Sequence, residues 1–67
     1  MTFKIKARND NSGKYGVTHF DTESGESLSD LFGTKIFASL ELATTYAEAE
    51  AAKIIAVGDE ASVEIIN

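Results

Sequence analysis

Apolar and cationic side chains alternate strictly over residues 3–8, the pattern of a β-strand with one buried face. The apolar set would point into a core, and the cationic set would face solvent. The apolar positions are Phe3, Ile5 and Ala7, and the cationic positions are Lys4, Lys6 and Arg8. Five turn-forming residues follow at 9–13, where Gly13 can adopt a positive φ, before residues 15–20 return to β-favouring types. The two segments therefore predict an antiparallel hairpin.

Residues 40–57 contain neither glycine nor proline, are rich in alanine, and predict the one long helix of the chain. Ser39 is a suitable N-cap for this helix, and the helix dipole favours Glu41 in its first turn. At 100° per residue, one face of the helix forms an apolar stripe that should lie on the sheet. The members of this stripe are Leu40, Ala43, Ala47, Ala51, Ile54 and Ile55.

Two further strands are predicted, at residues 34–38 before the helix and at residues 61–66 after a polar turn that begins at Gly58. Residues 21–26 form a polar loop. Ser27 and Asp30 then have the spacing of a capping box, which favours a short helical turn that ends at Gly33.

These elements predict one α+β domain over residues 1–67, with strand, strand, strand, helix, strand in chain order. The sheet would have three to four strands, and the helix would pack on one face of it. If the strands on either side of the helix run parallel, the sheet is mixed. Large apolar side chains are available for a core in most segments. They are Phe3, Ile5, Val17, Phe20, Leu31, Phe32, Ile36, Phe37, Leu40, Ile54, Ile55, Val63 and Ile65.

The absence of cysteine excludes disulfides and thiolate metal sites, and it suits a reducing compartment. The first residues lack the continuous apolar run of a signal peptide, and no stretch is long enough to span a membrane, so we expect a cytoplasmic protein. The net charge of −5 is unevenly distributed. Residues 1–18 carry four cations against one carboxylate, and residues 19–67 carry two cations against ten carboxylates. This acidity disfavours direct binding to nucleic acid and favours a basic partner or plain solubility.

No set of residues predicts catalysis or a metal site. His19 is the only histidine, and Asp21 shares its strand face, but no activated nucleophile accompanies them, so we expect a half-exposed strand histidine. Asp21, Glu23, Glu26 and Asp30 crowd one loop without the register of a calcium-binding loop. Glycine-rich phosphate-binding motifs are absent. We therefore expect a protein that is not an enzyme and that holds no cofactor.

The side of the helix opposite its core stripe carries no charge, whereas a solvated helix surface normally carries Lys and Glu. This helix strip consists of Leu42, Thr45, Ala49, Ala52 and Ala56. Its small side chains would allow close approach of a partner or of a second copy of the chain. Equally, the strip can be an exposed helix surface that is rich in alanine because alanine favours helices.

The layout of a hairpin, a short strand, one helix and a last strand in 67 acidic residues resembles the small proteins that bacteriophages encode against host defences, such as anti-CRISPR inhibitors and DNA mimics. The resemblance rests on size, charge and layout over the whole chain, and no motif residue is matched. It implies binding without chemistry, in which carboxylates stand in for phosphates and block a basic, nucleic-acid-binding protein of the host.

On this hypothesis, the partner-binding residues are carboxylates of the acidic loop and of one helix edge. The candidates are Asp21, Glu23, Glu26, Asp30, Glu41 and Glu48. The alternative hypothesis is a self-assembling structural or accessory protein that forms a homodimer through the helix strip.

Overall fold

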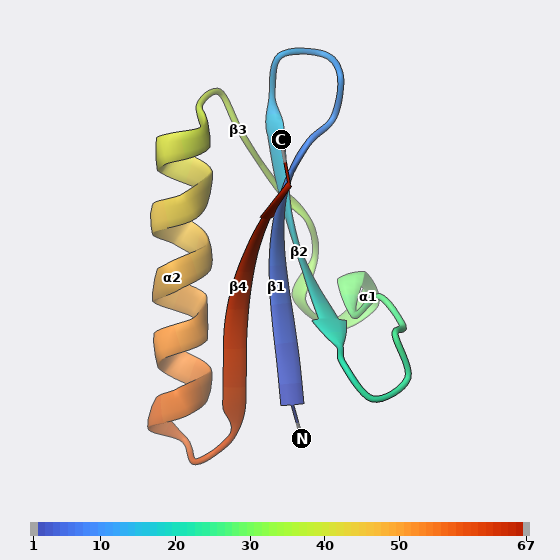
Figure 1. The fold of residues 1–67 in the computed structure, drawn as a ribbon, viewed down its shortest axis with the longest axis vertical. Helices are drawn as coiled ribbons and strands as arrows, with labels where there is room; N and C mark the ends of the chain where they lie inside the picture. Colours follow the sequence, from blue (N-terminus) through green and yellow to red (C-terminus); the bar gives the residue numbers. More distant parts are fainter. Residues whose placement is uncertain (1, 67) are drawn as a thin grey trace.

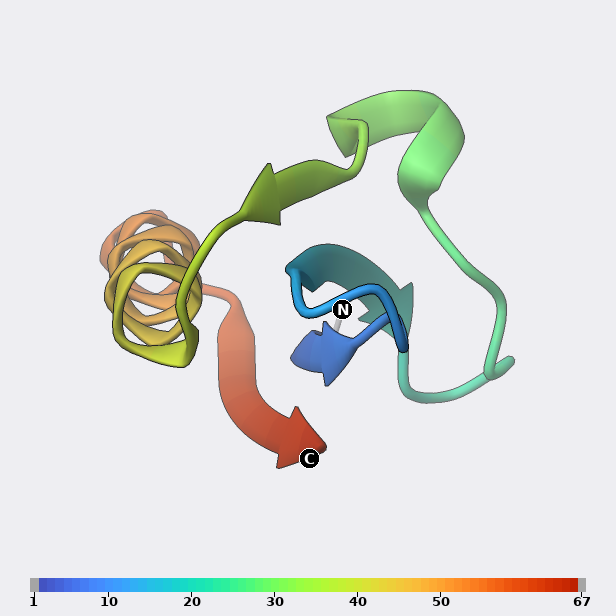
Figure 2. The same cartoon turned by 90° about the horizontal axis from the view of Figure 1, so that it is seen from above.

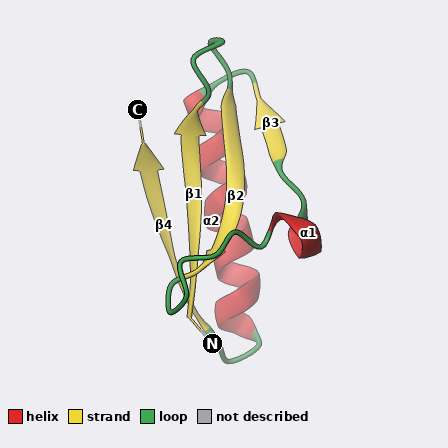
Figure 3. Cartoon of the chain, turned by 90° about the vertical axis from the view of Figure 1, so that its right-hand side faces the viewer, coloured by secondary structure: helices red, strands yellow, loops and turns green. Residues whose placement is uncertain are grey.

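The structure is a computed structural model that describes residues 2–66, in which one long helix lies on one face of a four-stranded sheet (Figures 1 and 3). The strands are β1 (Thr2–Asn9), β2 (Tyr15–Asp21), β3 (Lys35–Phe37) and β4 (Glu60–Ile66). The helices are α1 (Ser29–Phe32) and α2 (Leu40–Ala56). The α+β prediction is therefore confirmed, with the predicted order of elements along the chain.

The sheet is mixed, and its strand order is β3-β2-β1-β4. β1 and β2 form the predicted antiparallel hairpin, and β3 adds to β2 antiparallel. β4 returns to pair with β1 in parallel, so the chain between β3 and β4 crosses the sheet through α2. β3 and β4 thus run in the same direction without being neighbours. They form the two outer edges of the sheet.

The alternation in β1 divides the sheet into two different faces. Ile5 and Ala7 are buried under α2, and Phe3, on the same face, is buried beside Phe32 of α1. Lys4 and Lys6 are half-buried on the other face, which no helix covers (Figure 2). We refer to this second face as the open face.

α2 packs close to the sheet because its contact stripe is made of small side chains. Ala43, Ala47 and Ala51 are buried against Ile5 and Val17. The Ser39 hydroxyl accepts a hydrogen bond from the Leu42 amide at 3.2 Å, which confirms the predicted N-cap. At the other end, Gly58 follows the helix with φ of 95°, a conformation that other residues rarely adopt.

Several large apolar residues that we expected in the core lie outside it. Leu31, Ile36 and Ile55 are 78%, 55% and 56% exposed. Ile36 pairs with Gly16 on the open face, and Leu31 lies in the short helix α1, beside β2. Phe20 also lies on the open face, where the Lys6 ammonium sits 4.7 Å from its ring centre. The core is small because three alanines occupy the helix positions that contact the sheet.

The predicted capping box at Ser27 is wrong in its detail. α1 begins at Ser29, and the residue in the N-cap position, Leu28, makes no side-chain cap. The Ser27 hydroxyl instead accepts a hydrogen bond from the Ser29 amide at 3.2 Å. The Ser27 hydroxyl thus accepts from the Ser29 amide rather than from the Asp30 amide, and the capping box does not form.

Replacing Ser39 with alanine should lower the free energy of unfolding by about 1 kcal/mol, because the Leu42 amide loses its acceptor. Urea denaturation followed by circular dichroism measures the change. Ser39→Asp is the matched control, since aspartate also caps helices and should retain most of the stability. Equal loss in both variants would contradict a capping role.

Candidate functional site

The acidic loop, residues 21–28, is tied to the hairpin at several points. The Thr22 amide and hydroxyl both donate to the Thr2 carbonyl, at 3.1 and 3.0 Å. The Asp21 amide donates to the Glu26 carbonyl at 3.0 Å, and the Leu28 amide donates to the His19 carbonyl at 2.8 Å. These bonds hold both ends of the loop against the strands.

The carboxylates of this loop and of α1 point into solvent without counterions. Glu23, Glu26 and Asp30 are exposed, and none of them forms an ion pair within residues 2–66. Asp21 is half-buried and accepts a hydrogen bond from the Glu23 amide at 3.0 Å. The loop therefore presents, on a backbone held by hydrogen bonds, negative charge that no ion pair of residues 2–66 neutralises.

The two carboxylates on the helix lie away from this loop. Glu41 is in the first turn of α2 and Glu48 near its middle, both exposed. α2 and the loop lie on opposite sides of the sheet (Figures 1 and 2). The structure therefore brings together the four acidic positions from 21 to 30 and separates them from Glu41 and Glu48.

The helix strip faces away from the sheet, as the helical periodicity predicted. Leu42 is 55% exposed, and the other four members, Thr45, Ala49, Ala52 and Ala56, are exposed as well. The strip is thus an uncharged surface on the outside of the molecule.

His19 departs most from its prediction, because it is fully buried rather than half-exposed. Only 1% of the residue is exposed, and neither ring nitrogen has a hydrogen-bond partner within residues 2–66. The Phe32 ring stacks on the imidazole at 4.3 Å between ring centres. His19 points under α2 because its register partner is Ile5, the central residue of the buried face.

The carboxylate near His19 belongs to Glu50 of α2, not to Asp21. The distance from His19 Nε2 to Glu50 Oε1 is 3.6 Å, too long for a hydrogen bond. Glu50 accepts hydrogen bonds from the Lys53 ammonium at 2.8 Å and from the Tyr46 hydroxyl at 3.3 Å. The spacing of Tyr46, Glu50 and Lys53 along one helix flank was the available sequence signal for this cluster.

The environment of this cluster shifts its titration. Burial lowers the pKa of His19 below its ordinary value of 6.5, and the charge of Glu50 opposes that shift only in part. The hydrogen bond from Lys53 lowers the pKa of Glu50 despite its partial burial. The cluster therefore contains a neutral imidazole beside an ionised carboxylate near neutral pH. Within residues 2–66, no serine or threonine hydroxyl is hydrogen-bonded to His19.

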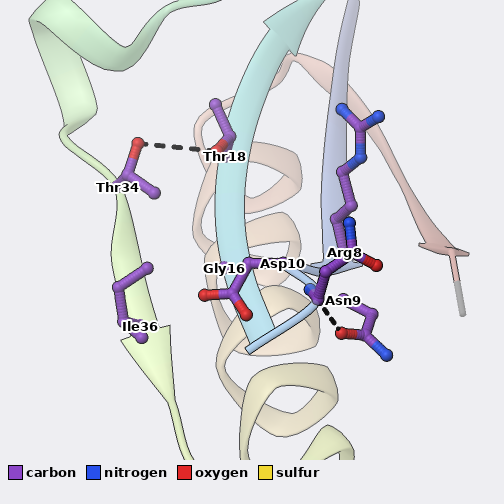
Figure 4. Close-up of a pocket in the computed structure, with 8 residues that line it drawn as sticks. Arg8, Asn9, Asp10, Gly16, Thr18, Thr34 and Ile36 are labelled. Atoms are coloured by element: carbon purple, nitrogen blue, oxygen red, sulfur yellow. Dashed lines mark hydrogen bonds between the residues drawn. The ribbon is translucent and has the colours of Figure 1, made fainter. Parts of the chain in front are cut away.

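The open face carries two hollows that the sequence did not predict. The larger, of ≈ 380 Å³, lies at the hairpin end between β2 and β3, and the smaller, of ≈ 180 Å³, lies beside Lys4, Lys6 and Phe20. Figure 4 shows Thr34 and Ile36 on one side of the larger hollow and Arg8 on the other.

Gly16 forms part of the lining of the larger hollow. A Cβ atom at this position would lie 3.4 Å from Ile36 Cδ1 and 3.8 Å from Thr34 Cγ2. Asp10, at the rim, accepts hydrogen bonds from the Ser12 hydroxyl and amide, which lower the pKa of its carboxyl group. The hollow is therefore lined mostly by polar side chains, and Ile36 and Gly16 form its apolar part.

Within residues 2–66, no helix is long and apolar enough to cross a bilayer. In the same part of the chain, no three histidine or acidic side chains are grouped as metal ligands. No protein-family model, curated protein or solved structure matches the chain.

The buried His19 should make stability depend on pH. Its pKa is lower in the folded state than in the unfolded state, so the stability it contributes is present above about pH 6.5 and is lost as pH falls below that value. Denaturation between pH 7.5 and 5.5 should show a slope of up to about 1.4 kcal/mol per pH unit. His19→Leu fills the space beneath Phe32 with a side chain that does not titrate, and it should remove the dependence of the unfolding free energy on pH in this range. The same slope in both proteins would contradict the assignment.

Proposed function

We propose that this protein is a protein-binding module without catalytic activity, and that its acidic loop binds a basic surface on its partner. The observation that carries the proposal is the exposed charge of Glu23 and Glu26 in the loop and of Asp30 on the adjoining α1, none of which forms an ion pair within residues 2–66. The resemblance in size and layout to phage-encoded inhibitors of host defences favours an inhibitor, for which a nucleic-acid-binding protein is the corresponding target.

The hydrogen bonds of the loop support this proposal energetically. A loop that is ordered only on binding loses conformational entropy at that moment, which weakens the complex. The bonds from Thr22, Asp21 and Leu28 hold the backbone of the acidic loop before a partner arrives. The carboxylates can then attract a basic surface from a distance and dock with little rearrangement.

The location of the acidic groups restricts the proposed interface to the loop and α1. The loop that carries Glu23 and Glu26 lies across the sheet from α2, which carries Glu41 and Glu48 (Figures 1 and 2). Asp21 ends β2, and Asp30 is on α1, beside the edge of β2. A single flat partner surface cannot contact both sets. We therefore assign Glu41 and Glu48 no direct contact in this interface.

Reversing charge in the loop should weaken partner binding. Glu23→Lys with Glu26→Lys should weaken it by at least about tenfold, since two favourable interfacial charges become repulsive. The tagged protein is used to capture partners from a bacterial lysate, with mass spectrometry of retained proteins and competition by DNA. The affinity for the recovered partner is then measured for each variant.

The matched control is Glu41→Lys with Glu48→Lys, which changes the net charge of −5 by the same amount on the other side of the sheet. The control should retain binding. Equal loss in both double variants would show that binding depends on overall charge alone, and unchanged affinity in the loop variant would reject the interface.

The alternative is a self-assembling structural or accessory protein that dimerises through the helix strip. The exposure of all five strip residues on the outside of α2 favours it, with Leu42 supplying the largest apolar side chain. Small side chains along the strip would let two helices approach closely.

Ala49→Glu tests this alternative, because it places a charge in the middle of the strip without touching the core. A dimer formed through the strip should dissociate into monomers, as measured by light scattering. A variant that keeps the mass of the wild-type dimer would exclude the strip as the interface.

A further inference from the structure

The two edges of the sheet differ in how they are protected against pairing with another strand. β3 is only three residues long, and short edge strands are a common protection. β4 has seven residues and contains no proline, no lysine and no break in its ladder with β1. Its outer edge lies free at the side of the sheet (Figure 3). Such an edge can accept another strand.

We infer that β4 is a homodimer interface, in which two copies pair their β4 strands antiparallel about a two-fold axis and join their sheets into one. The axis stands perpendicular to the sheet, so α2 of both copies lies on the same face of the joined sheet. This contact is separate from the acidic loop and from the helix strip, and it does not depend on the proposed function.

The sequence of β4 selects one register for this pairing. Directly opposed residues share a face, so a two-fold axis must pass through a residue of the strand. An axis at Ser62 would place Glu60 opposite Glu64 of the second copy, and an axis at Glu64 would place the two Glu64 side chains opposite each other. Like charges in such positions are unfavourable.

An axis at Val63 avoids both arrangements and pairs the whole strand from Glu60 to Ile66. Ser62 then lies opposite Glu64, and Ala61 lies opposite Ile65. Each Glu64 brings its own counterion, because the Lys4 ammonium lies 3.3 Å from it.

Exposed isoleucines on the helix side of β4 fit the same register. Ile65 is on that side because it pairs with the buried Ala7, and it is 39% exposed. Ile55 is 56% exposed on the flank of α2 toward β4, since Tyr46, on the opposite flank, contacts Phe37 of β3.

α2 leads directly into the start of β4, so Ile55 lies at the Ala61 end of the strand. In the dimer, Ile65 of the second copy lies opposite Ala61. Ile55 of one copy and Ile65 of the other therefore lie at the same end of the dimer interface, where the contact between them shields both from water.

Two substitutions of opposite charge at Ser62 test the interface. This exposed residue lies opposite Glu64 of the second copy in the proposed dimer and opposite Lys4 in its own chain. Ser62→Glu should weaken the dimer by about tenfold, and Ser62→Lys should strengthen it by a similar factor. Within one chain, the nearby Lys4 favours the glutamate, whereas Glu60 and Glu64 on the same face of β4 favour the lysine. Urea denaturation of each variant measures the effect on folding separately from the effect on the dimer dissociation constant.

Sedimentation equilibrium of the full chain over a wide concentration range gives the dimer dissociation constant. Ile65→Lys should also weaken the dimer, whereas Leu42→Lys, which adds the same charge to another exposed apolar site, on the helix strip, should leave it unchanged. A wild-type protein that stays monomeric at every concentration overturns the inference. So does a dimer that is insensitive to the Ser62 variants, or a monomer that binds an extended peptide of another protein along β4.

Discussion

The close approach of α2 to the sheet is the constraint on which the rest of the structure depends. Ala43, Ala47 and Ala51 present so little side chain that the helix backbone can lie directly over Ile5 and Val17. This contact buries few apolar atoms, so the core of this small domain is thin. Large apolar side chains that find no place between helix and sheet remain at the surface, where they are available to other chains.

The same thin core explains why a histidine can be buried there. His19 fills space beneath α2 that alanines leave open, with Phe32 stacked above it and Glu50 beside it. On folding, its ring nitrogens lose their hydrogen bonds to water and gain none within residues 2–66. This lowers the stability of the fold, whereas an apolar residue at the same position would not. Its place in the core therefore ties the stability of the fold to proton concentration.

The sequence predicted the fold because its strongest patterns are local. Strict alternation in β1 and an uninterrupted alanine-rich segment in α2 define which faces are buried, and the structure confirms both. The predictions that failed needed tertiary information. Whether His19 was buried depended on its partner across the hairpin, and the exposure of Ile36 depended on its pairing with Gly16. The periodicity of β2 could not decide which of its faces α2 would cover.

The candidate sites follow the same division. The solvent exposure of the helix strip and of the acidic loop could be read from the sequence, but the separation of Glu41 and Glu48 from that loop could not, because it depends on which side of the sheet each element occupies.

The parallel pairing of β1 with β4 has a consequence for synthesis in the cell. Thr2 pairs with Glu60 and Arg8 with Ile66, so β1 gains its second neighbour only after residue 66 has left the ribosome. Until then a nascent chain can form only the hairpin, its short third strand and α2, and the sheet lacks the strand that closes its β1 edge.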